Sequence, residues 1–330
     1  MRILVTGGAG FIGSNIVESL IADQNIEHVK VLDNLATSST ENIAEFYNSS
    51  KFEFIQADIR DYSACLHACD GIDLITHQAA LGSVPRSIDD PLTTNDVNIT
   101  GTLNIFTAAK EKKIKRVVYA ASSSTYGDHP GLPKVEHEIG KPLSPYAVTK
   151  YANELYADVF GRLYNIEFIG LRYFNVFGPK QNPKGAYAAV IPLFVQSLLD
   201  GQSPVINGDG ETSRDFTYVA NVVHANLLSL FTKNKKAVNE VYNIGYGQQT
   251  SLLQLAQDLK KITGVNLEAV HAPERSGDVK HSLADISKAK SLLGYDPAIS
   301  VEEGLRQTCE WYKLKREGQK TKSINQRSSV

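Results

Sequence analysis

A glycine-rich turn near the start of the chain constrains the fold more than any other feature. Residues 2–6 are apolar enough to predict a buried parallel strand, and Gly7-Gly8-Ala9-Gly10-Phe11-Ile12-Gly13 follows directly. A helix pattern then runs through Ile16 and Leu20. Glycines at 7, 10 and 13 let backbone N–H groups approach a pyrophosphate at a helix N-terminus, where the helix dipole favours negative charge. Strand, glycine turn and helix in this order therefore predict a dinucleotide-binding unit.

The next two strands end in acidic residues. His28–Leu32 predicts a second strand that ends at Asp33-Asn34, where a carboxylate can accept hydrogen bonds from the adenine-ribose diol and repel a 2′-phosphate. Because no arginine follows in the next several positions, the sequence favours NAD over NADP. Lys51–Ala57 predicts a third strand ending at Asp58-Ile59-Arg60. Asp58 either faces the adenine edge or precedes the helix from Asp61 as a cap, and both interpretations stay open.

Strand and helix continue to alternate. Gly71–His77 predicts a fourth strand, and the small residues that follow, Gln78-Ala79-Ala80-Leu81-Gly82-Ser83, leave room for a cofactor beside the sheet. Pro91–Lys110 predicts one long helix that carries Asn98 and Thr100, and Lys115–Ala121 predicts a fifth strand. This alternation predicts an α/β fold of the Rossmann type, a doubly wound parallel sheet with helices on both faces.

A tyrosine and a lysine lie one helical turn apart beyond the fifth strand. Tyr146 and Lys150 stand at i and i+4, on one face of a predicted helix. A tyrosine acts as a base near neutral pH only if its pKa falls well below roughly 10, and a nearby ammonium and an oxidised nicotinamide both favour the phenolate. The fifth strand delivers Ser122 to the same edge, where it could hydrogen-bond a substrate hydroxyl or belong to a polar turn. Another copy of the spacing, Tyr47 and Lys51, lies in a polar segment, so the spacing alone is not specific.

Length and charge limit the function classes. The 330 residues suggest about two domains, and a net charge of −2 argues against nucleic acid or an anionic membrane as the main partner. Three cysteines cannot all pair internally, and Cys65-x-His67-x-Cys69 has no second ligand pair nearby, so the sequence predicts no metal site. With no basic leader and no apolar span of membrane length, we expect a cytoplasmic protein.

Taken together, these motifs resemble the extended short-chain dehydrogenase/reductases. The shared features are Gly-x-x-Gly-x-x-Gly, Asp33, Ser122 ahead of Tyr126-Gly127, and Tyr146-x-x-x-Lys150. More narrowly, the segments 80–87, 171–178 and 208–216 resemble the UDP-N-acetylglucosamine 4-epimerases, and the resemblance spans roughly residues 1–312. In that family the serine lies four positions before the tyrosine of Tyr-Gly, so the role is assigned to Ser122 rather than Ser123.

The resemblance implies the following site residues. The catalytic residues are Ser122, Tyr146 and Lys150. The NAD-binding residues are Gly7, Gly10, Phe11, Ile12, Gly13, Asp33, Asn34, Asp58, Ile59, Gln78, Ala79, Ala80, Thr100, Tyr146, Lys150 and Tyr173. The UDP-sugar-binding residues are Ser83, Arg86, Ser123, Ser124, Asn175, Ala189, Val190, Val205, Asn207, Arg214, Arg275, Asp278 and Ser282. Among these, Val205 and Asn207 lie near the uracil, and the arginines at 214 and 275 bind the diphosphate, which suits a planar guanidinium.

The resemblance also implies how the chain is divided. An NAD-binding domain covers residues 1–175 with returning segments at about 215–247, and a discontinuous UDP-sugar domain covers 176–312. The polar and basic segment 313–330 is expected to be a disordered tail. Family members commonly dimerise through helices that match Pro91–Lys110 and Tyr146–Leu163, so a homodimer is expected.

The implied reaction interconverts UDP-GlcNAc and UDP-GalNAc through a 4-keto intermediate, in the synthesis of cell-surface polysaccharide precursors. In glucose-specific relatives a bulky tyrosine commonly matches Ser282, and a serine leaves volume for an N-acetyl group. Sugar-nucleotide 4,6-dehydratases and decarboxylases place acidic residues where Ser123 and Ser124 stand, which weakens both alternatives. Epimerases of UDP-glucose/UDP-galactose or of the uronic acids UDP-GlcNAcA/UDP-GalNAcA stay open, the latter because Arg86 or Ser83 could meet a C6 carboxylate. A catalytically silent NAD-binding sensor or scaffold is the alternative from another class.

Overall fold

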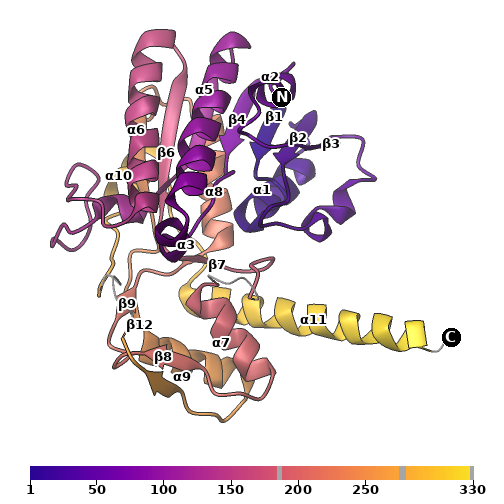
Figure 1. Ribbon diagram of the computed structural model, residues 1–330, viewed down its shortest axis with the longest axis vertical. Coiled ribbons are helices and arrows are strands. Elements are labelled where there is room, and N and C mark those ends of the chain that lie inside the picture. The colour runs from indigo at the N-terminus through magenta and orange to yellow at the C-terminus, as the bar shows by residue number, and fades with distance from the viewer. Residues whose placement is uncertain (184–187, 275–279, 328–330) are drawn as a thin grey trace.

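The computed structural model describes residues 1–183, 188–274 and 280–327, and its centre is a seven-stranded parallel sheet (Figure 1). The strand order is β11-β6-β5-β4-β1-β2-β3. The strands are β1 Arg2–Thr6, β2 His28–Asp33, β3 Phe52–Gln56, β4 Leu74–His77, β5 Arg116–Ser122, β6 Glu167–Tyr173 and β11 Glu240–Ile244. Because β1 pairs with β2 on one side and β4 on the other, the order reverses there, and this leaves a crevice at the carboxyl ends of these strands. The predicted fold class is confirmed.

Helices cover both faces of the sheet, and the alternation of side chains along each strand explains why both faces are apolar. In β1, Ile3 and Val5 belong to the core under α1 Phe11–Ala22 and α8 Val219–Phe231, whereas Leu4 belongs to the core on the opposite face. That opposite face is covered by α2 Tyr62–Ala68, α5 Gly101–Glu111 and α6 Pro145–Tyr164. The short α10 Ser287–Leu293 packs on β11.

The helix predicted over 91–110 is interrupted. The structure has α3 Val84–Asp89, α4 Pro91–Asn95, a π-helical turn η3 Asp96–Thr100, and then α5. The turn contains Asn98, whose buried side chain accepts from Leu81 N (2.8 Å) and donates to Leu81 O (3.1 Å) and Thr149 Oγ1 (3.1 Å). A π-helical turn re-aims a side chain in this way, and apolar periodicity does not report it.

A smaller second part lies below the sheet in Figure 1. Its elements are β7 Val176–Phe177, α7 Val190–Leu199, β8 Val205–Asn207, β9 Ser213–Arg214, β10 Thr217–Tyr218, β12 Thr250–Ser251, α9 Leu252–Thr263, β13 Val270–Ala272 and the start of α11 Val301–Arg327. Its core is a separate apolar cluster that includes Phe194, Leu255 and Leu305. Between its segments, α8 and β11 return to the main sheet, and the domain limits given above stay a prediction.

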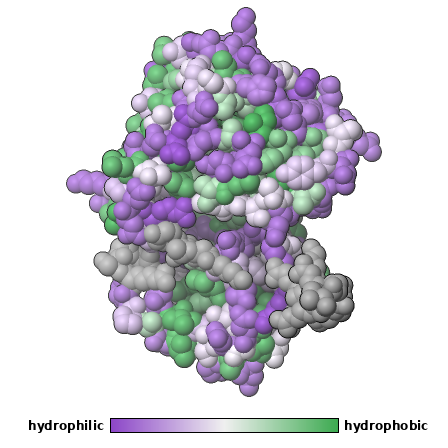
Figure 2. Space-filling model, turned by 45° about the vertical axis from the view of Figure 1, so that its right-hand side comes forward, coloured by the Kyte–Doolittle hydropathy of each residue, from purple (hydrophilic) through white to green (hydrophobic). Residues whose placement is uncertain are grey.

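The surface narrows between the two parts. Figure 2 shows a constriction between the larger upper part and the smaller lower part, with hydrophilic and hydrophobic side chains interspersed over this face. In the part of the chain that the structure describes, no helix is both long enough and apolar enough to cross a membrane.

The chain end was expected to be a disordered tail, and that expectation stays a prediction. Helix α11 continues to Arg327 and extends away from the body (Figure 1). It is anchored at its root by Tyr312, which is buried and donates a hydrogen bond to Gln181 O. The residues that follow are mostly Lys, Arg, Glu and Gln, which have high helix propensity, and the segment contains no proline.

Candidate active site

A cavity of about 460 Å³ opens at the carboxyl ends of β1, β2, β4, β5 and β6. All the predicted NAD-binding residues line it except Asp58 and Thr100. The predicted catalytic residues Ser122, Tyr146 and Lys150 line the same cavity. The sheet therefore brings together predicted NAD-binding residues that lie up to 166 positions apart, from Gly7 to Tyr173.

The glycine turn has no room for side chains. Gly7 has φ +67°, and a Cβ there would lie 2.7 Å from Ala79 N. A Cβ on Gly13 would lie 2.1 Å from Gly7 O. Helix α1 starts after Gly10, which offers no side chain to cap the first turn, so its backbone N–H groups are available to an anion. This close backbone approach at a helix start fits the pyrophosphate of a dinucleotide.

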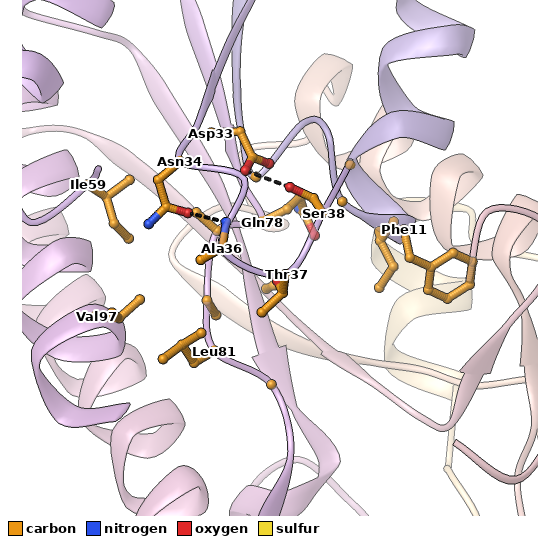
Figure 3. A pocket seen from close by; sticks show the side chains of 18 of the residues that line it. Phe11, Asp33, Asn34, Ala36, Thr37, Ser38, Ile59, Gln78, Leu81 and Val97 are labelled. Carbon is orange, nitrogen blue, oxygen red and sulfur yellow. Dashed lines mark hydrogen bonds between the residues drawn. The ribbon is translucent and has the colours of Figure 1, made fainter. Parts of the chain in front are cut away.

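Asp33 organises the next part of the wall. Its carboxylate accepts hydrogen bonds from Ala9 N (3.0 Å), Leu35 N (2.8 Å) and Ser38 Oγ (2.9 Å). Figure 3 shows Asp33 bonded to Ser38 at the rim, and Ile59, Leu81 and Val97 along the side opposite Phe11. A fixed anion beside an apolar wall fits an adenine and its ribose diol.

Two predicted cofactor residues lie outside the cavity. Asp58 accepts hydrogen bonds from Asn34 Nδ2 (2.8 Å) and Arg60 Nη2 (2.8 Å), and Arg60 lowers the pKa of Asp58 to about 2. Its carboxylate thus faces Arg60 rather than the cavity. Arg60 does line the cavity, but it pairs with Asp58 and Asp96, so the cation is already compensated. Thr100 is exposed on the π-helical turn.

The start of α6 fixes the catalytic candidates. Ser144 Oγ accepts from Ala147 N (3.2 Å) as the N-cap, and Pro145 occupies the first turn. These two residues fix the start of α6 and therefore the position of Tyr146 in its first turn. Lys150 is 4% exposed, and its Nζ donates to Ala120 O (2.8 Å) and lies 5.9 Å from the centre of the Tyr146 ring. Ser122, the last residue of β5, accepts from Ser124 N (3.2 Å) and Ser124 Oγ (2.9 Å).

The protonation of these groups is set by burial as well as by charge. Burial raises the pKa of Tyr146, and a hydrogen bond with Ser122 lowers it. Burial lowers the pKa of Lys150 to about 8, and the Glu154 carboxylate raises it. Desolvation therefore opposes the Tyr146 phenolate that the sequence hypothesis required, so positive charge beside the phenol has to outweigh it.

A second cavity, of about 240 Å³, adjoins the first and shares Asn175 and Val176 with it. The predicted residues that line the second cavity are Asn175, Ala189, Val190, Val205, Asn207 and Arg214. Ser282 lines neither cavity, but its Oγ accepts from Asn175 Nδ2 (3.1 Å), whose residue lines both cavities, and from Asp215 N (3.4 Å).

The remaining predicted substrate residues lie elsewhere. Ser83 caps α3, and Ser123 and Ser124 form the turn η4 Ser123–Tyr126; none of the three lines either cavity. Arg86 lines a different hollow, with Lys180 and Trp311. Arg275 and Asp278 lie outside the described residues.

Sequence reasoning missed part of each wall. The residues missed include Ala36, Thr37, Ser38, Thr93, Val97, Ala120, Phe177, Thr212, Phe216 and Leu252. The serine-rich run after Asp33 was a usable signal, because short polar side chains commonly bond the carboxylate that ends a strand. Apolar wall residues such as Leu252 carry no such signal. Among the described residues, no group of His, Cys, Asp and Glu is placed to hold a metal ion.

Comparisons with known proteins agree with this geometry. The family model described as "NAD dependent epimerase/dehydratase family" matches residues 3–245. A putative UDP-glucose 4-epimerase of Methanocaldococcus jannaschii is 42% identical over 314 residues, covering 94% of this chain and 98% of that protein. A solved structure of UDP-N-acetylglucosamine 4-epimerase from Methanobrevibacter ruminantium M1, in complex with UDP-N-acetylmuramic acid, superposes with a TM-score of 0.90 at 40% identity, covering 95% and 98% of the two chains. UDP-glucose 4-epimerase from Thermotoga maritima, with UDP-glucose, gives 0.89 at 38% identity, covering 96% and 99%.

Proposed function

Because this chain belongs to the NAD dependent epimerase/dehydratase family, and within it to the UDP-sugar 4-epimerases, we propose that it interconverts UDP-GlcNAc and UDP-GalNAc. The observation that carries the choice of an N-acetylated sugar is Ser282. Its small side chain is hydrogen-bonded to Asn175, which lines both cavities, so a larger side chain at position 282 would displace Asn175 and reduce the space beside the sugar. Relatives of similar identity are named as UDP-glucose and as UDP-N-acetylglucosamine 4-epimerases, so sequence identity does not distinguish the two substrates. The choice of the N-acetylated sugar therefore depends on the geometry at Ser282.

NAD, the cofactor predicted from the sequence, is the cofactor of this family. The residues present fit it: the glycine turn for the pyrophosphate, Asp33 for the ribose diol, and the Tyr146 and Lys150 end of the cavity for the nicotinamide. NAD held by these residues would supply the hydride chemistry, acceptance of a hydride from C4 of the sugar and its return to the opposite face of C4.

The chain's own residues handle the proton and the position of the sugar. In the proposed roles, the Tyr146 oxygen takes the proton of the sugar 4-hydroxyl as the C4–H bond breaks, and gives it back when that bond re-forms. Ser122 Oγ lies beside Tyr146 and positions the hydroxyl. Lys150 contributes a positive charge on the same helix face, which favours the ionised tyrosine. Arg214 and the wall formed by Val205 and Asn207 hold the UDP.

A direct assay tests the proposal. Purified protein is incubated with UDP-GlcNAc, without added NAD, and the products are resolved. We expect UDP-GalNAc and no net reduced cofactor, because the hydride returns to the sugar in every turnover. Reduced cofactor without UDP-GalNAc, or no product at all, would reject the proposal; no turnover of UDP-glucose or the uronic UDP-sugars in parallel assays would then favour the silent NAD-binding protein.

UDP-glucose is the second candidate substrate, favoured by the names of the relatives. The variant Ser282→Tyr separates the two. It should lose most activity towards UDP-GlcNAc because the larger side chain displaces Asn175 into the space for the N-acetyl group, while it keeps activity towards UDP-glucose. Equal loss on both sugars would show that position 282 does not select the N-acetyl group. The C4 epimerases of uronic sugars find less support, because Arg86 lines neither cavity.

We also propose a homodimer that forms through α6 and the neighbouring α3–α5 segment. Leu155, Val159 and Leu163 are exposed along α6, and Leu92 is 82% exposed nearby. Contiguous exposed apolar residues mark interaction surfaces, and a self-complementary helix pair fits a two-fold dimer. Sedimentation should show a dimer that Leu155→Glu dissociates and that Leu314→Glu, on exposed α11, leaves intact. Cytoplasmic location and polysaccharide precursor synthesis complete the proposed role.

A further inference from the structure

Helix α6 carries a third ionisable residue on the face of the catalytic candidates. Glu154 follows Lys150 by four residues, as Lys150 follows Tyr146, so the three lie one above another. Glu154 is 7% exposed and lies inside the protein between α6 and β6. A carboxylate at this depth requires a partner.

That partner is Arg172 of β6. Arg172 Nε donates to Glu154 Oε1 (2.9 Å) and Nη2 to Glu154 Oε2 (2.7 Å), and Arg172 is 2% exposed. The guanidinium cannot swing away, because Nη1 donates to Glu136 O (2.9 Å) and the group lies 4.8 Å from the centre of the Tyr126 ring. Tyr126 is held in turn by its bond to Asn243 Oδ1 (2.5 Å). The Glu154 carboxylate is therefore fixed from the β6 side.

Lys150 lies on the other side of Glu154. Its ammonium is buried, and the charged or titratable groups that face it are Tyr146 and Glu154 on α6 and His77 on β4, with Arg172 and Tyr119 behind Glu154. Burial disfavours the charge on Lys150, and the Glu154 carboxylate one helical turn away offsets this in part. Arg172 forms the ion pair with Glu154, and Lys150 is the second buried cation that this carboxylate stabilises.

We propose that Glu154 is a positioning residue of the 4-epimerase reaction: its carboxylate, anchored by Arg172, keeps Lys150 protonated beside Tyr146. The inference rests on the proposed roles of Tyr146 and Lys150 in that reaction. It assigns to Glu154 an effect on the charge of a neighbour, not a contact with the sugar or the cofactor.

Stability alone does not account for this ion pair. A buried pair often contributes no more to stability than well-packed apolar residues would, because desolvation offsets the attraction. A second arginine–glutamate pair, Arg116 with the partly buried Glu167, lies at the other end of β5 and β6, away from the cavity. Glu167→Gln is therefore a control for the loss of a carboxylate from an arginine pair outside the site.

The test measures the charge on Lys150 directly. Lysine is labelled with ¹³C at Cε in NAD-loaded wild type, Glu154→Gln, Glu154→Asp and Glu167→Gln, and the Lys150 signal, identified by its absence in Lys150→Met, is titrated by NMR. Removing the charge of Glu154 should lower the proton affinity of Lys150 about tenfold, a shift of one pKa unit. Glu154→Asp, which keeps the carboxylate, should restore most of the wild-type value, and Glu167→Gln should not move the signal.

The pH profile of turnover supplies the second readout. In Glu154→Gln the alkaline limb of kcat should move to lower pH with KM little changed, whereas a purely structural loss would lower kcat at every pH. An unmoved Lys150 titration in folded Glu154→Gln, or an equal shift in Glu167→Gln, would overturn the inference. If the wild type turns over no UDP-sugar, the proposed function fails, and the NMR titration still decides whether Glu154 holds the charge on Lys150.

Discussion

The two ends of the β5–β6 pair use the same chemistry for different purposes. At the amino end, Arg116 donates to Glu167 from Nε (2.9 Å) and Nη2 (2.5 Å), and its Nη1 bonds Ser229 O and Leu230 O of α8. At the carboxyl end, Arg172 also donates from Nε and Nη2, but to the two separate oxygens of Glu154, whereas both of these Arg116 bonds end on Glu167 Oε2. The first pair ties strands to a helix and meets solvent through Lys235, whereas the second lies behind Lys150 and Tyr146.

This contrast follows from the topology. In an open parallel sheet, the crevice forms outside the carboxyl ends of the strands, at the point where the strand order reverses. An ion pair at that end lies next to the reacting groups, whereas one at the amino end does not. The difference between the two ends can be tested by matched substitutions.

The largest contrast is expected along α6, which starts at the carboxyl edge and ends at the amino edge. Tyr146→Phe should lower kcat by roughly 10³-fold or more, because the proton acceptor is lost, while NAD stays bound. Tyr164→Phe, at the last residue of the same helix, should leave kcat near the wild-type value. The measurement is kcat with UDP-GlcNAc together with the NAD content of each purified variant; unchanged turnover in Tyr146→Phe would place the base elsewhere.

The two ion pairs should differ next. Glu154→Ala leaves Arg172 buried without its carboxylate and should cost about 3–5 kcal/mol of unfolding free energy. Glu167→Ala should cost less, because that site borders solvent, with the Lys235 side chain 77% exposed. Urea unfolding midpoints at constant m-value measure both. Equal costs would mean that the two ends are desolvated alike.

Glycine turns at the two edges give a third comparison. Gly13→Ala forces a Cβ against Gly7 O and should cost about 3 kcal/mol. If the glycine turn changes its conformation while the rest of the fold is kept, the same free-energy cost appears as roughly a hundredfold loss of NAD affinity. Gly71→Ala, before β4 at the amino edge, meets only the Arg2 guanidinium at 3.6 Å and carries the strain of φ +67°, about 1 kcal/mol. NAD titration and urea unfolding separate the two outcomes, and full NAD affinity with wild-type stability in Gly13→Ala would contradict the packing argument.

The smallest effect concerns pH. His77, at the carboxyl end of β4, is held between Thr6 Oγ1 (2.6 Å) and Thr102 Oγ1 (3.0 Å), and burial, aided by Lys150, lowers its pKa to about 3. Between about pH 6.5 and 3 the unfolded chain binds a proton there that the folded chain does not. The contribution of neutral His77 to the free energy of unfolding is complete above about pH 6.5. It declines as the pH falls, and the decline reaches about 2 kcal/mol at pH 5. Urea midpoints at pH 7 and 5 should show this decline in the wild type and a smaller one in His77→Gln, with His28→Gln at the amino end of β2 as the control. An undiminished decline in His77→Gln would assign the acid sensitivity to other groups.

Local signals predicted the parts of the site that depend on neighbours in sequence. The glycine turn, Asp33 and the Tyr146–Lys150 spacing all report on one turn or one helix face, and the structure gathers them in one cavity. The π-helical turn at Asp96–Thr100 was missed, because it depends on Asn98 reaching Leu81 and Thr149.

Residues whose position depends on distant contacts could not be inferred. Asp58 turns to Arg60, and Glu154 finds its partner 18 positions away on another element. The course of α11 depends on Tyr312 contacting Gln181, 131 positions earlier. Such pairings follow from the assembled fold, and apolar periodicity carries no record of them.

The wall that Asn175 and Val176 place between the two cavities has a thermodynamic consequence. If binding of the nucleotide sugar changes the conformation of this shared backbone, the two binding equilibria are coupled. The free energy by which the bound sugar strengthens NAD binding then equals the free energy by which bound NAD strengthens sugar binding. Reciprocity of this kind would let a bystander nucleotide such as UDP tighten the hold on NAD without any chemistry taking place.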